Sequence, residues 1–151
     1  MTDIINHPAH YESSGPFECI ELTRLYGFDW GNAIKYVWRH KSKHKGADGA
    51  LEDLGKAAWY ISDASAHGMD VCVATDNWDE DSGIENQHKA EDLLDMAIED
   101  DVAGASGFWW AMRCQGYSAC VSALEELAAP YREEAPEAYE RFQNALKEAK
   151  Q

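Results

Sequence analysis

The chain lacks the features that mark several classes of protein. Its four cysteines stand far apart in 151 residues and form no CxxC pair, which argues against a disulfide scaffold and a cysteine-rich zinc site. No apolar run approaches the roughly 18 residues of a membrane span, and the N-terminus lacks the charged and apolar blocks of a signal peptide. We therefore expect a cytoplasmic protein with reduced thiols and no membrane partner.

Basic residues are scarce as well. The chain has 13 lysines and arginines against 28 aspartates and glutamates, so its formal charge is −15. Residues 1–67 contribute only −2 of this charge, whereas residues 68–151 contribute −13. Because such an acidic half repels a phosphate backbone, we expect no direct binding of nucleic acid. Residues 35–45 are the exception, since they carry five lysines and arginines and no acid.

Long alternating runs of β-branched residues are absent, and the 45% of hydrophobic residues supply enough apolar surface for a core. We predict an all-α fold with an N-terminal three-helix unit at 1–68. An acidic connector at 69–84, with a short extended piece at 71–74, leads to an acidic helical extension at 85–151 that packs on the first unit. The expected helices span 16–27, 29–46, 48–68, 86–101, 106–115, 117–129 and 136–149.

The second predicted helix, 29–46, has two opposing faces at roughly 100° per residue. The apolar face consists of Trp30, Ala33, Ile34, Val37 and Trp38. The polar face consists of Asn32, Lys35, Tyr36, Arg39 and Lys43. Such a face can hold phosphates, because arginine offers a bidentate fork, lysine a point charge, and tyrosine a ring that stacks on a base. An exposed face that pairs with the acidic half explains the same charges.

The third predicted helix, 48–68, carries large aromatic residues outside its apolar stripe. Its polar side consists of Glu52, Asp53, Lys56, Trp59, Tyr60 and Asp63. Lys56 follows Glu52 by four residues and Asp53 by three, so these charges can form ordinary ion pairs on the helix surface. Trp59 and Tyr60 must instead contact a ligand, a partner chain or the C-terminal helices, and for Trp59 we favour a protein contact. Because six tryptophans in so short a chain are hard to bury together, we expect a homo-oligomer.

Familiar catalytic motifs are missing. The segment 49–56 resembles a P-loop only superficially, because five residues separate its glycines and Ala57 stands where the motif needs serine or threonine. His7 and His10 flank a proline turn and could contact phosphate, but a zinc site needs further ligands that this spacing does not supply. Glu18 lies on the apolar arc of the first predicted helix, where Arg39 or Lys56 is the expected partner.

Several stretches of the first half, taken in order, nevertheless match one known pattern. They are HPAHY at 7–11, Glu18, GNAIKYVWRHKSKH at 31–44 and LEDLGKAAWYI at 51–61. Over residues 6–67 the chain resembles the SaV-like, bacteriophage nucleotide kinase-like family. The resemblance implies a phage protein that works in the host bacterial cytoplasm as a nucleoside monophosphate kinase without a P-loop. The matching positions are His7, His10, Tyr11, Glu18, Asn32, Lys35, Tyr36, Arg39, Asp53, Lys56 and Tyr60.

These positions give a hypothesis for phosphoryl transfer from ATP or another nucleotide to an acceptor nucleotide. Lys35, Arg39 and Lys56 would neutralise charge on the transferred group, and Asp53 or Glu18 would hold Mg²⁺ or orient the acceptor. The expected substrate-binding residues are His7, His10, Tyr11, Asn32, Tyr36, Lys43 and Tyr60.

Three alternatives fit the same sequence. A phage protein that sequesters a nucleotide or blocks a host factor would use the cationic face without turnover. An all-α nucleotide pyrophosphohydrolase would use Glu18, Glu21, Glu52 and Asp53 to hold Mg²⁺ and activate water. The acidic half could also act as a decoy for a basic, nucleic-acid-binding host protein.

Overall fold

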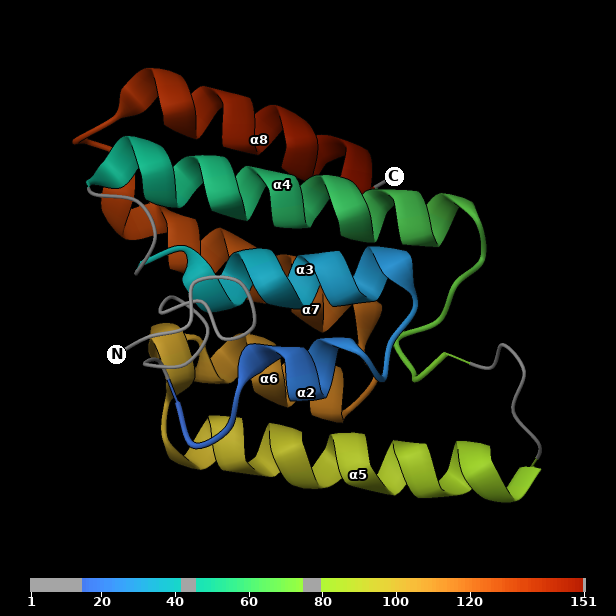
Figure 1. Ribbon diagram of the computed structural model, residues 1–151. Helices are drawn as coiled ribbons and strands as arrows, with labels where there is room; N and C mark the ends of the chain where they lie inside the picture. The colour runs from blue at the N-terminus through green and yellow to red at the C-terminus, as the bar shows by residue number, and fades with distance from the viewer. Residues whose placement is uncertain (1–14, 42–45, 75–79, 151) are drawn as a thin grey trace.

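The computed structural model describes residues 15–41, 46–74 and 80–150. Within these ranges every regular element is helical, which confirms the predicted all-α class (Figure 1). The elements are, in chain order, α2 (Cys19–Thr23), α3 (Phe28–Arg39), α4 (Ala47–Ala66), α5 (Glu80–Glu99), the 3₁₀ turn η1 (Val102–Gly104), α6 (Ser106–Arg113), α7 (Tyr117–Ala128), the 3₁₀ turn η2 (Ala129–Tyr131) and α8 (Pro136–Lys150).

The first helix is shorter than predicted. Helix α2 begins after Glu18, whose backbone N–H donates a hydrogen bond to Glu21 Oε2 at 2.8 Å as part of a capping box. It ends where the N–H groups of Leu25 and Tyr26 bond to carbonyls only three residues back. These tighter bonds end the α-helical ladder before the glycine that was expected to stop it.

The connector is also shorter than predicted, because α5 begins at Glu80. The acids at this point were taken as a break in the helical pattern. Acids in a first turn are instead favoured by the helix dipole, so they mark the start of α5. The predicted extended piece at 71–74 forms no strand among the described residues, although Val71 and Val73 are buried and the Ala74 N–H bonds to the Leu25 carbonyl at 2.9 Å.

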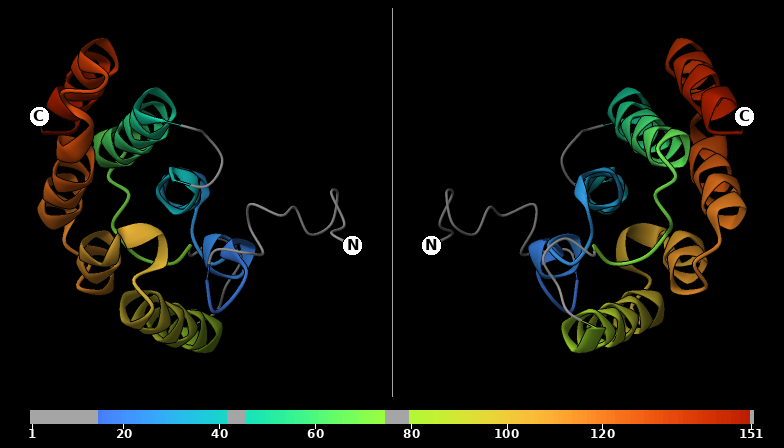
Figure 2. Two further views of the ribbon diagram at one scale, coloured as in Figure 1. Left: turned by 90° about the vertical axis from the view of Figure 1, so that its left-hand side faces the viewer. Right: turned by 90° about the vertical axis from the view of Figure 1, so that its right-hand side faces the viewer.

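Helix α4 lies between two neighbours and organises the rest of the fold. It packs along α8 on one side and along α3 on the other, and it also contacts α7. Helix α5 packs on α6 and touches α2 at the opposite edge of the molecule (Figure 2). A single core cluster runs from Phe17 to Ala149 and therefore crosses the predicted boundary near residue 68.

The predicted apolar faces are the buried ones. All five apolar-face residues of α3 are buried, as is the stripe of α4 formed by Ala50, Leu51, Leu54, Ala57, Ala58 and Ile61. Trp38 meets Trp109 of α6 edge to face, with ring centroids 5.9 Å apart. The Trp109 indole donates to the Val102 carbonyl at 3.0 Å, so the buried ring has a partner for its only donor.

Among the described residues, each helix is too short or too polar to cross a bilayer.

The contact between α4 and α8 gives a stability prediction. Phe142 of α8 is 1% exposed, and its Cα lies 3.8 Å from where a Cβ would stand on Gly55. Phe142→Ala should lower the free energy of unfolding by about 3–5 kcal/mol, because it leaves a cavity beside α4. Urea denaturation followed by circular dichroism measures this. The exposed neighbour Gln143 is the control, and equal effects of Phe142→Ala and Gln143→Ala would contradict the packing described here.

Candidate functional site

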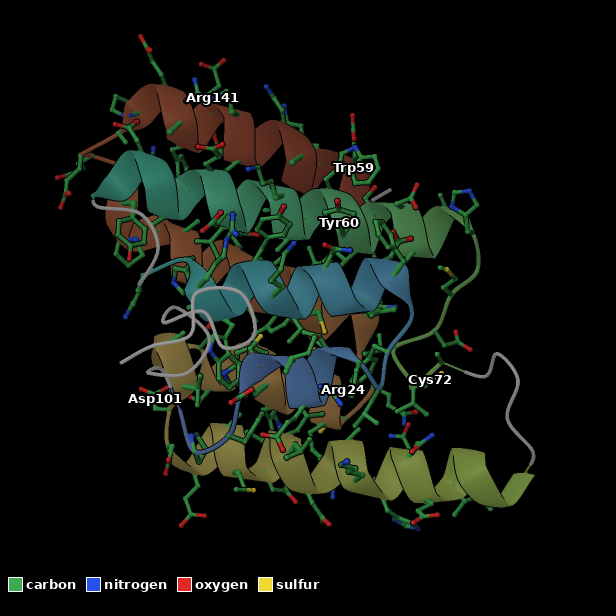
Figure 3. All side chains as sticks on the ribbon, viewed as in Figure 1. Arg24, Trp59, Tyr60, Cys72, Asp101 and Arg141 are labelled. Carbon is green, nitrogen blue, oxygen red and sulfur yellow. The ribbon has the colours of Figure 1, made fainter. Side chains whose placement is uncertain are left out.

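Two tyrosines from neighbouring helices form the centre of the candidate site. The rings of Tyr36 on α3 and Tyr60 on α4 stack with centroids 5.9 Å apart and an interplanar angle of 14°. Both side chains are partly exposed. Figure 3 shows Tyr60 at the edge of α4 that borders α3, on the same face of the molecule as Arg24, which follows α2. The helix pair therefore presents a stacked aromatic platform on its surface.

Three cations surround the Tyr36 ring. Lys35 Nζ lies 4.4 Å from the ring centroid, Arg39 Cζ 4.7 Å and Lys56 Nζ 5.4 Å. Each distance is within the range of a cation–π contact. We call Tyr36, Tyr60, Lys35, Arg39 and Lys56 the Tyr36 cluster. Like charges gathered this closely favour an anion beside them.

Arg39 and Asp53 are buried, which corrects the prediction that both lie on polar faces. Arg39 is 7% exposed and Asp53 0% exposed, and Arg39 Nη2 lies 3.3 Å from Asp53 Oδ1. Both residues lie in the contact between α3 and α4, so each helix covers part of the polar face of the other. One of the three cations of the cluster is therefore already balanced by a carboxylate.

The two accessible cations of the Tyr36 cluster are Lys35 and Lys56. Lys35 is partly exposed, and Lys56 lies 3.2 Å from Glu52, four residues earlier on α4. Both Lys56 and Glu52 are well exposed, so this pair contributes little and Lys56 can exchange Glu52 for another anion.

The carboxylates expected to hold Mg²⁺ lie in separate settings. Glu18 and Glu21 form the capping box of α2, whereas Asp53 contacts Arg39. Over the described ranges, no group of three or more histidine, cysteine, aspartate or glutamate side chains is arranged to hold a metal ion. The Mg²⁺ site of the phosphoryl-transfer hypothesis therefore stays a prediction.

The other predicted site residues fall into two groups. Asn32 is partly exposed, and its Nδ2 donates to the Phe28 carbonyl at 2.8 Å. Four predicted residues lie outside the described residues: His7, His10, Tyr11 and Lys43.

Trp59 is 51% exposed and lies at the rim of an apolar groove between α4 and α8. Its ring meets Tyr60 edge to face at 5.1 Å. About half of Trp59 is therefore accessible, and the protein contact expected for it stays a prediction.

Sequence reasoning missed Phe28. It is 73% exposed, and its ring meets Tyr60 edge to face at 5.8 Å, so it extends the aromatic platform towards α2. The predicted helices end at Gly27 and begin again at Asp29, so Phe28 falls between them, whereas it is the first residue of α3. Its spacing of four to Asn32 and of seven to Lys35 would have placed it on the same helix face.

A carboxyl pair beside the site was also missed. Asp29 is 4% exposed and shares a side-chain hydrogen bond with Asp63 of α4. Burial, together with this bond and the charge of Asp63, raises the pKa of Asp29 from 3.8 to about 6. The exposed His67 lies 3.6 Å from Asp63 Oδ1 and partly balances the pair.

The comparisons with known proteins concern the same part of the chain. Residues 5–62 match a family described as a protein of unknown function, DUF3310. The match includes α2, α3 and nearly all of α4, and with them the whole Tyr36 cluster. No curated protein matches the chain. No solved structure matches it either. The likeness to a nucleotide kinase-like family thus stays a prediction.

The buried ion pair gives the first prediction from the site. Arg39→Ala should lower the free energy of unfolding by about 3–5 kcal/mol, because it leaves the Asp53 carboxylate buried without this guanidinium. The double variant Arg39→Met, Asp53→Leu should recover most of the loss. Lys35→Ala, one turn earlier, is the control and should cost less than about 1 kcal/mol. Denaturant unfolding checks all three, and a mild effect of Arg39→Ala would contradict the role assigned to the pair.

The carboxyl pair gives a pH prediction. The folded protein holds the Asp29 proton up to about pH 6, whereas the unfolded chain loses it near 3.8. This contribution to stability is therefore complete below about pH 3.8 and is lost as the pH rises through about 6. Asp29→Asn should raise the melting temperature at neutral pH and flatten its pH dependence over that window.

Asp48 is the matched control, because it is also the second residue of its helix but is exposed. Asp48→Asn should lower the melting temperature slightly through the helix dipole. If both variants behave alike, Asp29 does not carry the raised pKa.

Proposed function

We propose that the protein binds a nucleotide on the surface shared by α3 and α4, with its phosphates on Lys35 and Lys56. The observation that carries this proposal is the Tyr36 cluster, in which three cations lie within 5.4 Å of one aromatic centroid. In a chain with a formal charge of −15, such a concentration of bases needs a reason. Arg39 serves the packing of the two helices, and the two lysines are left to bind an anion.

The aromatic rings support a nucleotide over a simple anion. Phe28 and Trp59 both meet Tyr60 edge to face, and both are more than half exposed. An exposed ring of this kind stacks on a base, which is worth about 1–3 kcal/mol per base. Adjacent lysines supply charge-assisted hydrogen bonds to phosphate. A ligand with one aromatic part and one polyanionic part uses both features.

The charge of the whole chain supports a small ligand. Residues 68–151 carry −13, and a long polyanion would meet this field along its length. A mononucleotide needs only the local positive surface. The resemblance adds that the protein works in the cytoplasm of a phage-infected bacterium, and the exposure of Trp59 and Trp110 supports a homo-oligomer.

Phosphoryl transfer is the second candidate function. It rests on the resemblance over residues 6–67 and on the cations around Tyr36, which would neutralise charge on a transferred group. The alternative of a pyrophosphohydrolase has less support, because Glu18 and Glu21 close a capping box and Asp53 contacts Arg39. Binding without turnover needs only the residues already described.

A lysine variant tests the proposed binding. Lys56→Gln should weaken nucleotide binding about tenfold or more, because it removes a charged partner of the phosphates. Isothermal titration with AMP, ADP and ATP, with tryptophan fluorescence as a second readout, measures the effect. Lys89→Gln on α5 is the control, since Lys89 is exposed and lies outside the cluster. If the wild type binds none of these nucleotides, or if both variants bind equally well, the proposal is wrong.

Incubation with ATP, Mg²⁺ and a panel of nucleoside monophosphates separates binding from turnover. New diphosphates, resolved by chromatography and mass, would establish the kinase. Nucleotides that return unchanged while one co-elutes with the protein would leave sequestration as the function.

A further inference from the structure

A second groove lies beside the Tyr36 cluster. It runs between α2 and the first half of α3, with a volume of about 260 Å³. Its floor is close-packed backbone, since a Cβ on Gly31 would stand 3.2 Å from the Thr23 carbonyl oxygen. None of the residues at its α2 wall was predicted to take part in a site.

The groove combines two cations with apolar surface. Arg24, the residue that follows α2, is exposed, and its Nε donates to the Ile20 carbonyl at 3.2 Å, which holds the guanidinium at the rim. Lys35 of α3 also lines the groove. Phe28 and Ile20 supply the apolar surface, at 73% and 46% exposure.

The groove also has an amide side chain that can bind a ligand. Asn32 lines the same groove and uses its Nδ2 for the Phe28 carbonyl, so its Oδ1 can accept a hydrogen bond from a ligand. A guanidinium, an ammonium, an exposed ring and an amide oxygen together suit a nucleoside phosphate.

Two residues belong to both the groove and the Tyr36 cluster. Lys35 lines the groove while its Nζ lies 4.4 Å from the Tyr36 centroid. Phe28 lines the groove while its ring meets Tyr60 at 5.8 Å. The two binding surfaces are therefore adjacent, with one ammonium between them.

We infer that the groove between α2 and α3 is a second nucleotide subsite and that phosphates bound in both subsites converge on Lys35. Arg24 binds phosphate in the groove only, Lys56 binds phosphate at the Tyr36 cluster only, and Lys35 serves both. The inference rests on the proposed nucleotide binding. Two separate mononucleotides or the two halves of one dinucleotide would use the same chemistry.

Titration calorimetry with AMP tests the inference by stoichiometry. The wild type should bind two AMP per chain. Arg24→Gln should remove or weaken about tenfold only one of the two sites, Lys56→Gln only the other, and Lys35→Gln should weaken both. Lys89→Gln on α5 is again the control, because Lys89 is exposed and belongs neither to the groove nor to the Tyr36 cluster. Thermal unfolding of each variant excludes a loss of fold.

Diadenosine pentaphosphate distinguishes the two kinds of occupant. One molecule per chain, bound more tightly than AMP and weakened by both Arg24→Gln and Lys56→Gln, would support linked subsites that a dinucleotide spans. Two AMP per chain with no such gain for the dinucleotide would support separate mononucleotides.

A failure of the second subsite and a failure of the proposed function give different results. A single AMP site that Lys56→Gln removes and Arg24→Gln leaves unchanged would overturn the second subsite and leave the proposed function standing. No binding of any nucleotide by the wild type would overturn both.

Discussion

The buried contact between Arg39 and Asp53 is the constraint on which the candidate site depends. It joins the end of α3 to the first half of α4 at a point where both side chains are almost fully enclosed. A buried charge pair of this kind is costly to break, so it fixes how the two helices lie along each other. With this register, Tyr36 stacks on Tyr60 and the two lysines come to the same surface. The residue types that form the site are therefore held by a contact that is not itself available to a ligand.

The core of the matched segment is completed by the rest of the chain. Residues 5–62 end within α4, whose apolar stripe packs on α8 and α7, both of which lie beyond the match. The acidic C-terminal half thus covers the apolar side of α4. Its surface charge is negative, whereas the opposite side of α4 carries the Tyr36 cluster.

Much of the fold could be predicted from periodicity. The apolar arcs of α3 and α4 were assigned correctly, because burial of an amphipathic helix follows its hydrophobic pattern. Arg39 and Asp53 were misassigned, because residues at the edge of an arc become buried or exposed according to the neighbouring helix. A helical wheel contains no information about that neighbour. Phe28 was missed because it follows a turn glycine, although it begins α3. The early start of α5 was missed because its acids interrupt the apolar pattern, although acids are favoured in the first turn of a helix.

The candidate site was predictable in composition and less so in geometry. Lys35, Tyr36, Lys56 and Tyr60 were chosen from sequence, and the structure brings them together. Of the acids expected beside them, Asp53 and Glu52 pair with Arg39 and Lys56 of the cluster, whereas Glu18 and Glu21 form the capping box of α2. Arg24 could not be connected to Lys35 from sequence, because their proximity depends on the close approach of α2 to α3.

The most direct test of nucleotide binding at this surface is a two-dimensional ¹⁵N–¹H NMR titration of the full chain with AMP. The account predicts that chemical-shift changes among the described residues concentrate in 24–39 and 52–60, which comprise the turn after α2, α3 and the facing part of α4. Changes confined to α5–α8, or none at saturating AMP, would contradict it.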